Sequence, residues 1–318
     1  MLLKSAGRMF MTMLVVLLWQ SSAAVAAGGA YSRIVAFGDS VTDPGNAFVQ
    51  LHTSAVPPFD LVPSAPYARG GHHFSNGATW VEQLGTTLGL DPSPGPALRV
   101  PVVFSNYSVG AARARALPPN DLAAQVGLFL TDFAGAAPTD ALYVIHIGGD
   151  DLRDALVALQ TDPTFATSFA ILGEAFAALQ ANIVALASAG AHTFLVPNAP
   201  DLSLIPEVRL AGPAAQAAGQ GLAVQFNISL EALLGGLEGP PLGVKIFRLD
   251  IFDLIHEIVA APAEFGLTEV ADPCITPDTT VHPFCSRPDG HLFWDGIHPT
   301  RAGHGIIAGR ALTVLAAP

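Results

Sequence analysis

Residues 34–40 have the sequence IVAFGDS, an unbroken apolar run that ends in a Gly-Asp turn and a serine. Such runs are typical of strands buried on both faces of a parallel sheet. A residue directly after the strand lies at the carboxyl edge of the sheet, where open α/β sheets bind ligands. Ser40 is therefore a candidate nucleophile, although the same residues could form an ordinary strand-to-helix turn capped by Ser or Asp.

Similar apolar runs recur along the chain, with helical patterns between them. They predict strands at 33–38, 102–107, 142–148, 193–197 and 244–249. Helices are predicted over 79–88, 121–133, 165–189, 211–237 and 300–315, the last with Thr300 as its N-cap. Strands that alternate with helices indicate a parallel sheet covered on both faces. Segments 50–71 and 261–295 show no periodicity, and we predict that both are loops around the active site.

The composition is that of a globular protein with a sizeable core, because 51% of the 318 residues are hydrophobic and only 13% are charged. The formal net charge of −12 argues against binding to nucleic acids or to anionic membranes. We find no linker or internal repeat, and we therefore expect one domain over residues 27–318.

Residues 1–26 are predicted to be a secretory signal peptide. Lys4 and Arg8 precede a short apolar run, and small residues follow at 24–26. The run is too short to span a bilayer comfortably, so we expect export to the periplasm or outside the cell, without stable membrane insertion. In that oxidising compartment Cys274 and Cys285 are expected to form a disulfide.

A second group of chemical interest lies near the C-terminus, in the sequence WDGIHP at 294–299. A nucleophilic serine needs a base within hydrogen-bond reach, and the base needs an acid that orients it. Asp295 and His298, three residues apart, could supply both from one loop. An acid and a histidine at this spacing are a weak signal alone, but a serine at a strand end and a secretory signal strengthen it.

Four sequence blocks, in this order, resemble the GDSL (SGNH) family of serine esterases and lipases. They are FGDSVTDPGN (37–46), NYSVGAARA (106–114), IGGDDLRDA (147–155) and FWDGIHPT (293–300). FSNGATW (74–80) also resembles bacterial members of the family. The resemblance covers nearly the whole mature chain. It implies a flavodoxin-like three-layer α/β/α sandwich with a five-stranded parallel sheet, and acyl transfer through an acyl-serine without a metal or organic cofactor.

The family pattern also implies roles for individual residues. Ser40 would be the nucleophile, His298 the general base and then the general acid, and Asp295 the residue that orients His298. The oxyanion hole would use the backbone N–H groups of Ser40 and Gly110. Its third donor in the family is an asparagine side chain, and this chain has Asp150 at that position.

Asp150 leaves the activity open, because an ionised carboxylate cannot donate a hydrogen bond to an oxyanion. The loss of one such donor lowers the rate by about 10²–10³-fold. A protonated Asp150 could donate if burial or a neighbour such as Asp151 raised its pKa. Three explanations remain: a residue altered from the natural one, a natural departure with weak or acid-shifted activity, or lost catalysis.

For the substrate we expect carboxylic esters or lipids of short to medium acyl chain, with Phe74 and Trp294 beside an apolar acyl or alkyl pocket. Lipid acyltransferase and phospholipase activities on the same scaffold are alternatives, because a fold does not choose among them. A catalytically weakened relative that binds lipid or glycan is a third alternative, because of Asp150. The sequence does not predict the oligomeric state.

Several other polar residues near these blocks have simpler expected roles. Asp43 is expected to cap a turn rather than to touch the oxyanion loop, and Asn46 to hold the first block in shape. His146 is expected to be a packed, hydrogen-bonded histidine. His72 and His73 are expected to be exposed to solvent rather than to bind a metal.

Overall fold

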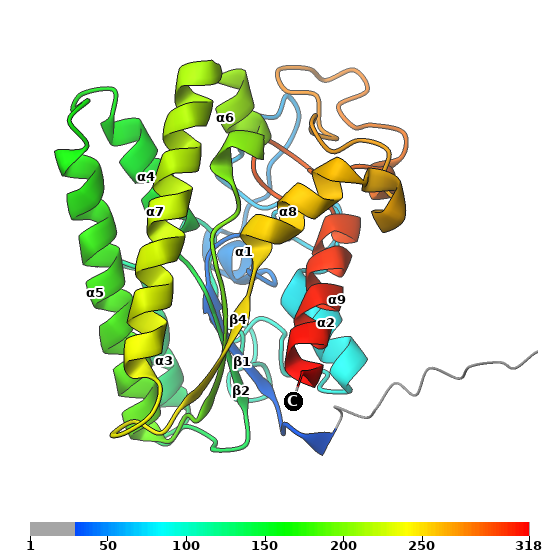
Figure 1. Ribbon diagram of the computed structural model, residues 1–318. Helices are drawn as coiled ribbons and strands as arrows, with labels where there is room; N and C mark the ends of the chain where they lie inside the picture. The colour runs from blue at the N-terminus through cyan, green and yellow to red at the C-terminus, as the bar shows by residue number, and fades with distance from the viewer. Residues whose placement is uncertain (1–28, 318) are drawn as a thin grey trace, which may run out of the picture.

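A parallel sheet of four strands forms the centre of the protein. The computed structural model describes residues 29–317, so the predicted signal peptide lies outside the described residues. The strands are β1 (Ile34–Gly38), β2 (Leu142–His146), β3 (Thr193–Pro197) and β4 (Lys245–Leu249), and they lie side by side in this order. All three pairings are parallel, so the carboxyl ends of the strands lie at one edge of the sheet (Figure 1).

The predicted fifth strand at 102–107 is reduced to a single bridge beside β1. The N–H of Ala36 donates to Ser105 O at 3.0 Å, and the N–H of Tyr107 donates to Ala36 O at 2.7 Å. Before this bridge the backbone turns, with Val102 at a φ of 69°. The prediction of five strands was therefore wrong for the described residues, because a turn interrupts the apolar run and leaves Val102 and Val103 exposed.

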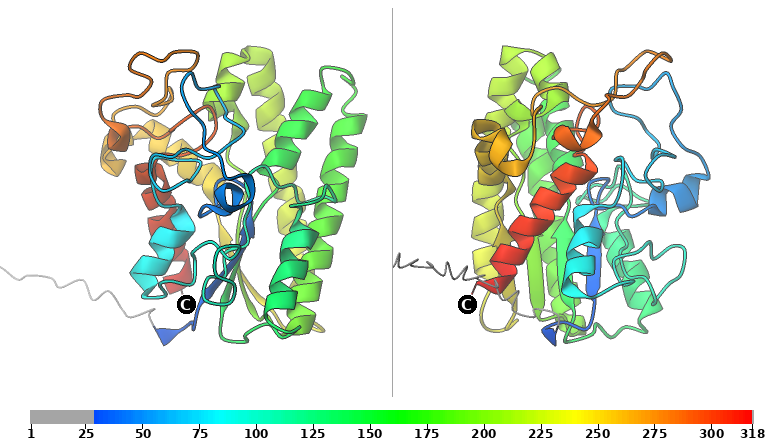
Figure 2. Two further views of the ribbon diagram at one scale, coloured as in Figure 1. Left: turned by 180° about the vertical axis from the view of Figure 1, so that it is seen from behind. Right: turned by 90° about the vertical axis from the view of Figure 1, so that its right-hand side faces the viewer.

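Helices cover both faces of the sheet, which confirms the predicted three layers (Figures 1 and 2). One face carries α3 (Leu122–Asp132), α4 (Gly149–Ala158), α5 (Ala166–Ala189) and α7 (Pro213–Leu237), and the other carries α2 (Trp80–Leu88) and α9 (Arg301–Ala316). The shorter helices are α1 (Asn46–Leu51), α6 (Pro206–Leu210) and α8 (Ile251–Ala260), with 3₁₀ turns at Leu202–Leu204, Pro262–Phe265 and Pro288–Gly290.

Side-chain caps fix the starts of three of the predicted helices. Thr79 begins α2 as part of a capping box with Glu82, Asp121 accepts from the N–H of Ala124 at the start of α3, and Thr300 caps α9 as predicted. Helix α4 was not predicted. It begins at Gly149 after Gly148, whose φ of 116° suits glycine, and a Cβ at Gly148 would lie 2.8 Å from the ring of Phe226.

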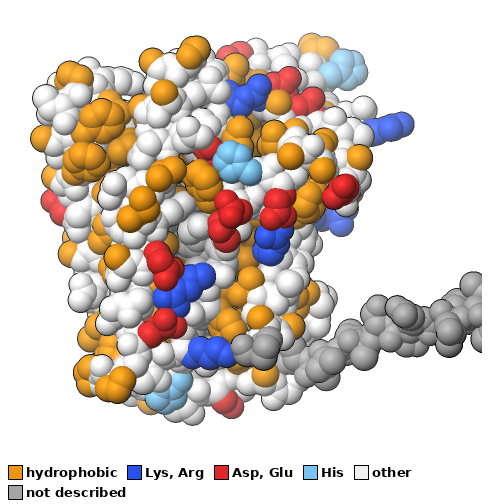
Figure 3. Space-filling view, in the orientation of Figure 1, with side chains coloured by type: hydrophobic (Ala, Val, Ile, Leu, Met, Phe, Trp, Pro, Cys, Tyr) orange, Lys and Arg blue, Asp and Glu red, His pale blue; other side chains and the backbone are white. Residues whose placement is uncertain are grey.

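Helix α5 is long and apolar enough, by length and composition, to cross a membrane. In this fold it packs against α3, α4 and α7, and its inner face buries Leu172, Leu179 and Ile183 in the main core. On the face of the molecule in Figure 3, Lys and Arg side chains lie among Asp and Glu side chains and form no basic patch.

The two predicted loop segments lie side by side above the carboxyl edge of the sheet (Figure 2). The N–H of Asp278 donates to Phe59 O at 3.0 Å, and the N–H of Gly296 donates to Leu61 O at 2.8 Å. The predicted disulfide between Cys274 and Cys285 is present in the second loop. These loops therefore form one layer over the end of the sheet that carries Ser40.

Candidate active site

Ser40, His298 and Asp295 form a continuous chain of hydrogen bonds. The Oγ atom of Ser40 lies 2.8 Å from His298 Nε2, and His298 Nδ1 lies 2.7 Å from Asp295 Oδ2. All three side chains are buried. Ser40 follows β1, whereas the other two residues come from the loop before α9. This geometry allows His298 to take the serine proton while Asp295 stabilises the resulting imidazolium.

Tyr67, from the first loop, holds the far side of the acid. Its hydroxyl donates to Asp295 Oδ2 at 2.9 Å, and Asp295 Oδ1 accepts from the N–H groups of Ile297 and His298 at 3.0 and 2.9 Å. Burial and the charge of Asp295 raise the pKa of Tyr67 well above its usual range, so the hydroxyl stays a donor. The carboxylate is therefore fixed from three directions, and Tyr67 is a positioning residue that the sequence did not reveal.

The disulfide loop supports the segment just before Asp295. The N–H of Cys274 donates to Phe293 O at 3.0 Å, and the N–H of Ile275 donates to Trp294 O at 2.9 Å. The ring of Trp294 is fully buried and packs edge-on against Tyr67, with centroids 5.5 Å apart. Trp294 therefore lies inside the loop layer and, contrary to the expectation from sequence, does not line the apolar pocket described below.

Phe74 is also placed differently from the expectation. Its ring packs on the imidazole of His298, with centroids 5.3 Å apart, and lies directly against Gly110. It is 5% exposed and does not line the apolar pocket described below. Phe74 therefore covers one side of the His298 ring instead of forming the wall of that pocket.

The expected oxyanion donors are only partly free. Among residues 29–317, the N–H of Ser40 has no acceptor within hydrogen-bond distance. The N–H of Gly110, the expected second donor, instead donates to Asp43 Oδ2 at 2.8 Å, so it is not available to an oxyanion in this structure. The next residue, Ala111, has a φ of 63°, in the left-handed region that favours glycine, and its N–H has no acceptor in the described part of the chain.

Asp43 and Asn46 organise the first two blocks. Asp43 accepts from the N–H groups of Gly45, Asn46 and Ala47, so it caps the start of α1 and also reaches the oxyanion loop. Burial raises the pKa of Asp43 to about 6, and its four N–H donors oppose that shift. The amide of Asn46 donates to the carbonyl oxygens of Asn106 and Ser108 at 2.8 and 2.9 Å, so it ties the first block to the second as expected.

Asp150 lies beside Ser40 at the ends of neighbouring strands, because Gly38 of β1 pairs with His146 of β2. Its Oδ1 atom is 3.3 Å from Arg153 Nη1 and 4.0 Å from Arg113 Nη1. Burial raises the pKa of Asp150, and the two guanidinium groups oppose this shift. Asp150 is thus a buried carboxyl that two cations partly stabilise in its ionised form.

Besides burial, the negative charge of Asp150 raises the pKa of Asp39, whereas Asp151 is held by other partners. Burial and the nearby charge of Asp150 raise the pKa of Asp39 to about 8. Asp151 faces away from the pocket and accepts from the N–H of Ala114 at 2.7 Å and from Arg115 Nη1 at 2.8 Å. The two carboxyls that interact beside Ser40 are therefore Asp39 and Asp150. Because two arginines lie near Asp150, we place the proton of this pair on Asp39 at neutral pH.

Three histidines considered in the sequence, His146, His73 and His72, have structural partners. The Nδ1 atom of His146 accepts from the indole N–H of Trp80 at 3.1 Å, and burial lowers the pKa of His146 to about 4. His73 is buried and lies 2.9 Å from Glu82, so the prediction of solvent exposure was wrong for this residue, whereas His72 is half-buried and stacks on Phe48. Within the described residues no group of three His, Cys, Asp or Glu side chains is suited to a metal ion.

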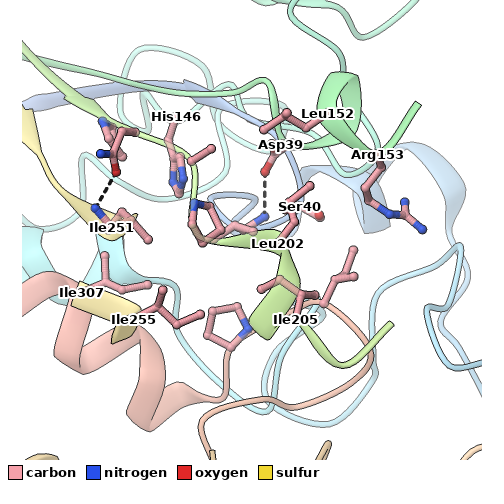
Figure 4. Close-up of a pocket in the computed structure, with 18 of the residues that line it drawn as sticks. Asp39, Ser40, His146, Leu152, Arg153, Leu202, Ile205, Ile251, Ile255 and Ile307 are labelled. Carbon is pink, nitrogen blue, oxygen red and sulfur yellow. Dashed lines mark hydrogen bonds between the residues drawn. The ribbon is translucent and has the colours of Figure 1, made fainter. Parts of the chain in front are cut away.

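An apolar pocket with a cavity of about 140 Å³ opens next to Ser40. Its polar lining groups include Asp39, Ser40, Asp150 and Arg153. The remaining wall is mostly aliphatic and comes from the segment after β3, from α8 and from α9 (Figure 4). Its main aliphatic members are Leu152, Leu202, Ile205, Ile251, Leu254, Ile255, Ile258 and Ile307.

The family model for GDSL-like lipase/acylhydrolase matches residues 34–311, which include every block and the complete site. The chain belongs to this family. Family membership makes it a carboxylic ester hydrolase by class.

Several relatives of this GDSL-family chain are known by name. A GDSL esterase/lipase of Arabidopsis thaliana is 26% identical over 87% of both chains. The phosphatidylcholine-sterol acyltransferase of Aeromonas hydrophila is 24% identical over 90% of both. A Pseudomonas putida protein from the trpE-trpG intergenic region is 29% identical over 93% of this chain, which spans 50% of that protein. The solved acetylxylan esterase Axe2 of Geobacillus stearothermophilus has a TM-score of 0.47 at 16% identity, over 90% of this chain and 95% of its own.

Proposed function

We propose that the protein hydrolyses carboxylic esters through an acyl-Ser40 intermediate. The observation that carries this proposal is the hydrogen-bond chain from Ser40 through His298 to Asp295. His298 Nε2 removes the hydroxyl proton as Oγ attacks the carbonyl carbon, and it returns that proton to the alkoxide that leaves. Water then attacks the acyl-serine and gives its proton to His298, which returns that proton to Ser40 Oγ as the carboxylic acid is released.

The oxyanion of the tetrahedral intermediate needs donors beside Ser40. We propose that the N–H groups of Ser40 and Ala111 supply two of them, because both lack acceptors among the described residues while Gly110 is bonded to Asp43. Asp150 takes the place of a third donor and adds none while it is ionised. The enzyme is therefore active but slower at neutral pH than one with asparagine at this position.

We further propose that residues 1–26 direct export and that 27–318 form the mature domain. The disulfide supports an oxidising destination, the periplasm or the cell exterior. Water is the proposed acyl acceptor. An alcohol would give acyl transfer, so analysis of products in the presence of added alcohol distinguishes the two reactions.

The test is hydrolysis of p-nitrophenyl acetate and butyrate by the purified mature chain and by Ser40→Ala. Ser188→Ala is a matched control, because Ser188 is exposed on α5 and distant in the chain from every site residue. We expect turnover by the wild type and the control, none by Ser40→Ala, and covalent labelling of Ser40 by a fluorophosphonate. Absence of both turnover and labelling in the folded wild type would overturn the proposal.

A further inference from the structure

The acyl-serine chemistry does not require the apolar pocket beside Ser40, because its aliphatic side chains take no part in the reaction. Asp39, Ser40 and Arg153 lie on one side of the pocket, and Ile251, Ile255 and Ile307 lie on the other (Figure 4). His146 and Asn198 are further polar members of an otherwise mostly aliphatic lining. An apolar cavity that opens directly at a nucleophile suits a hydrocarbon chain attached to the carbon under attack. The apolar lining therefore indicates that a hydrocarbon part of the ester enters the pocket.

The size of the cavity limits the length of such a chain. An engineered aliphatic cavity of ~150 Å³ in another protein takes up benzene, which has six carbon atoms. The cavity here measures about 140 Å³, so it holds a chain of about six carbons. Longer chains would have to leave through the mouth, where Arg153 and Glu207 form an ion pair at the rim.

The walls of the pocket are tied to one another, which opposes expansion. The side-chain oxygen of Asn198, after β3, accepts from the N–H of Ile251 at 2.6 Å at the start of α8. Asp201, in the same segment, lies 3.0 Å from His256 of α8. These contacts join the segment after β3 to α8, two elements that line the pocket, so we expect a sharp upper limit on chain length rather than gradual adaptation.

The placement of His298 indicates which side of the ester enters the pocket. The alcohol must leave next to His298 Nε2, because that atom protonates it. His298, Phe74 and Gly110 do not line the pocket, whereas Ser40 and Asp150 do. The substituent of the carbonyl carbon that points away from His298 is the acyl chain.

We infer that this pocket is an acyl-chain site that selects linear acyl groups of about six carbons. The inference rests on the proposed ester hydrolysis at Ser40 and assigns its substrate class. Each buried methylene contributes about fourfold to kcat/KM when it enters such a site. The value should therefore rise steeply from acetyl to hexanoyl esters and fall for decanoyl and palmitoyl esters.

Two substitutions at Ile255 test the assignment in opposite directions. Ile255 is buried in α8 and lines the pocket. Ile255→Phe should lower kcat/KM for the hexanoyl ester at least tenfold and leave the acetyl ester within about twofold. Ile255→Ala should move the optimum of kcat/KM to longer acyl chains. This variant tests the assignment if Ile255→Phe does not fold. Ile228→Phe, at a position 60% exposed on α7, is the matched control and should change neither.

A pair of esters with the two chains exchanged separates acyl from alcohol binding. Ile255→Phe should impair hydrolysis of ethyl hexanoate and spare hexyl acetate. The reverse result would overturn the acyl assignment, as would an equal loss on both esters. If the wild type hydrolyses acetyl esters through Ser40 but shows no preference for chain length, the acyl site is refuted and the proposed function stands. If the folded wild type hydrolyses no ester, both fail.

Discussion

Replacing Asp150 with asparagine should make the enzyme faster. Asp150 Oδ1 lies 3.3 Å from one guanidinium and 4.0 Å from a second, so these cations offset most of its repulsion of an oxyanion. What remains is the missing donor, worth about 10²–10³-fold in kcat. We therefore expect Asp150→Asn to raise kcat for p-nitrophenyl butyrate by about 100-fold at pH 8, with little change in KM.

The gain should depend on pH in a defined direction. Burial raises the pKa of Asp150 above its ordinary value, so as the pH falls the wild-type carboxyl gains a proton that it can donate. The ratio of kcat between Asp150→Asn and the wild type should therefore shrink from pH 8 to pH 5. Ionisable groups that the two enzymes share affect both values of kcat, and the ratio largely removes their effect.

The assay needs one control on the same helix. Asp154 makes bidentate contact with Arg113 and does not line the pocket, so Asp154→Asn removes a carboxylate without adding an oxyanion donor. It should not raise kcat. A kcat for Asp150→Asn equal to or below that of the wild type at every pH would refute the donor argument.

Three further predictions concern the support of the site. Tyr67→Phe removes one hydrogen bond to the Asp295 carboxylate, so kcat should fall about tenfold with KM unchanged; steady-state kinetics checks this, and an unaltered kcat would show that the backbone donors suffice. Because burial and a neighbouring carboxyl raise the pKa of Asp39 from 3.8 to about 8, the folded state keeps a proton that the unfolded state loses, so the free energy of unfolding should fall from pH 4 to pH 8. Urea denaturation at pH 4 and at pH 8 should show a smaller fall in the free energy of unfolding for Asp39→Asn than for the wild type. An equal fall in both proteins would contradict the assignment. Replacing Cys274 and Cys285 together by serine opens a loop with a sequence separation of 11 and should lower the free energy of unfolding by about 3 kcal/mol, measured by calorimetry. It should also lower kcat, since the bridged loop donates to the backbone before the catalytic acid; unchanged kcat would limit the bridge to stability.

Local patterns predicted the strands and most long helices, because buried runs and caps depend on residues close in sequence. The run at 102–107 looked equally apolar, yet the turn at Val102 left it a single bridge to β1. Helix α4 was hidden by the two glycines at its start, and packing against Phe226 requires the first of them, Gly148.

The triad could be identified from short motifs, but its surroundings could not. Tyr67 carries no local signal in its loop, and only the folded chain brings it to Asp295. The amide of Gly110 was assigned as a donor from the family pattern, and its bond to Asp43 is a contact between blocks that no single block reveals. The pocket likewise combines residues from segments far apart, so no one segment predicts the isoleucines that line it.

The separation of Ser40 and His298, 258 positions apart in the chain, links activity to synthesis. Ser40 is synthesised directly after β1, whereas His298 is synthesised only just before α9. An unfinished or C-terminally truncated polypeptide thus carries a serine with no partner and cannot attack esters. The chain therefore has no esterase activity until translation is nearly complete. Ester cleavage shows that the two ends of the chain have folded together.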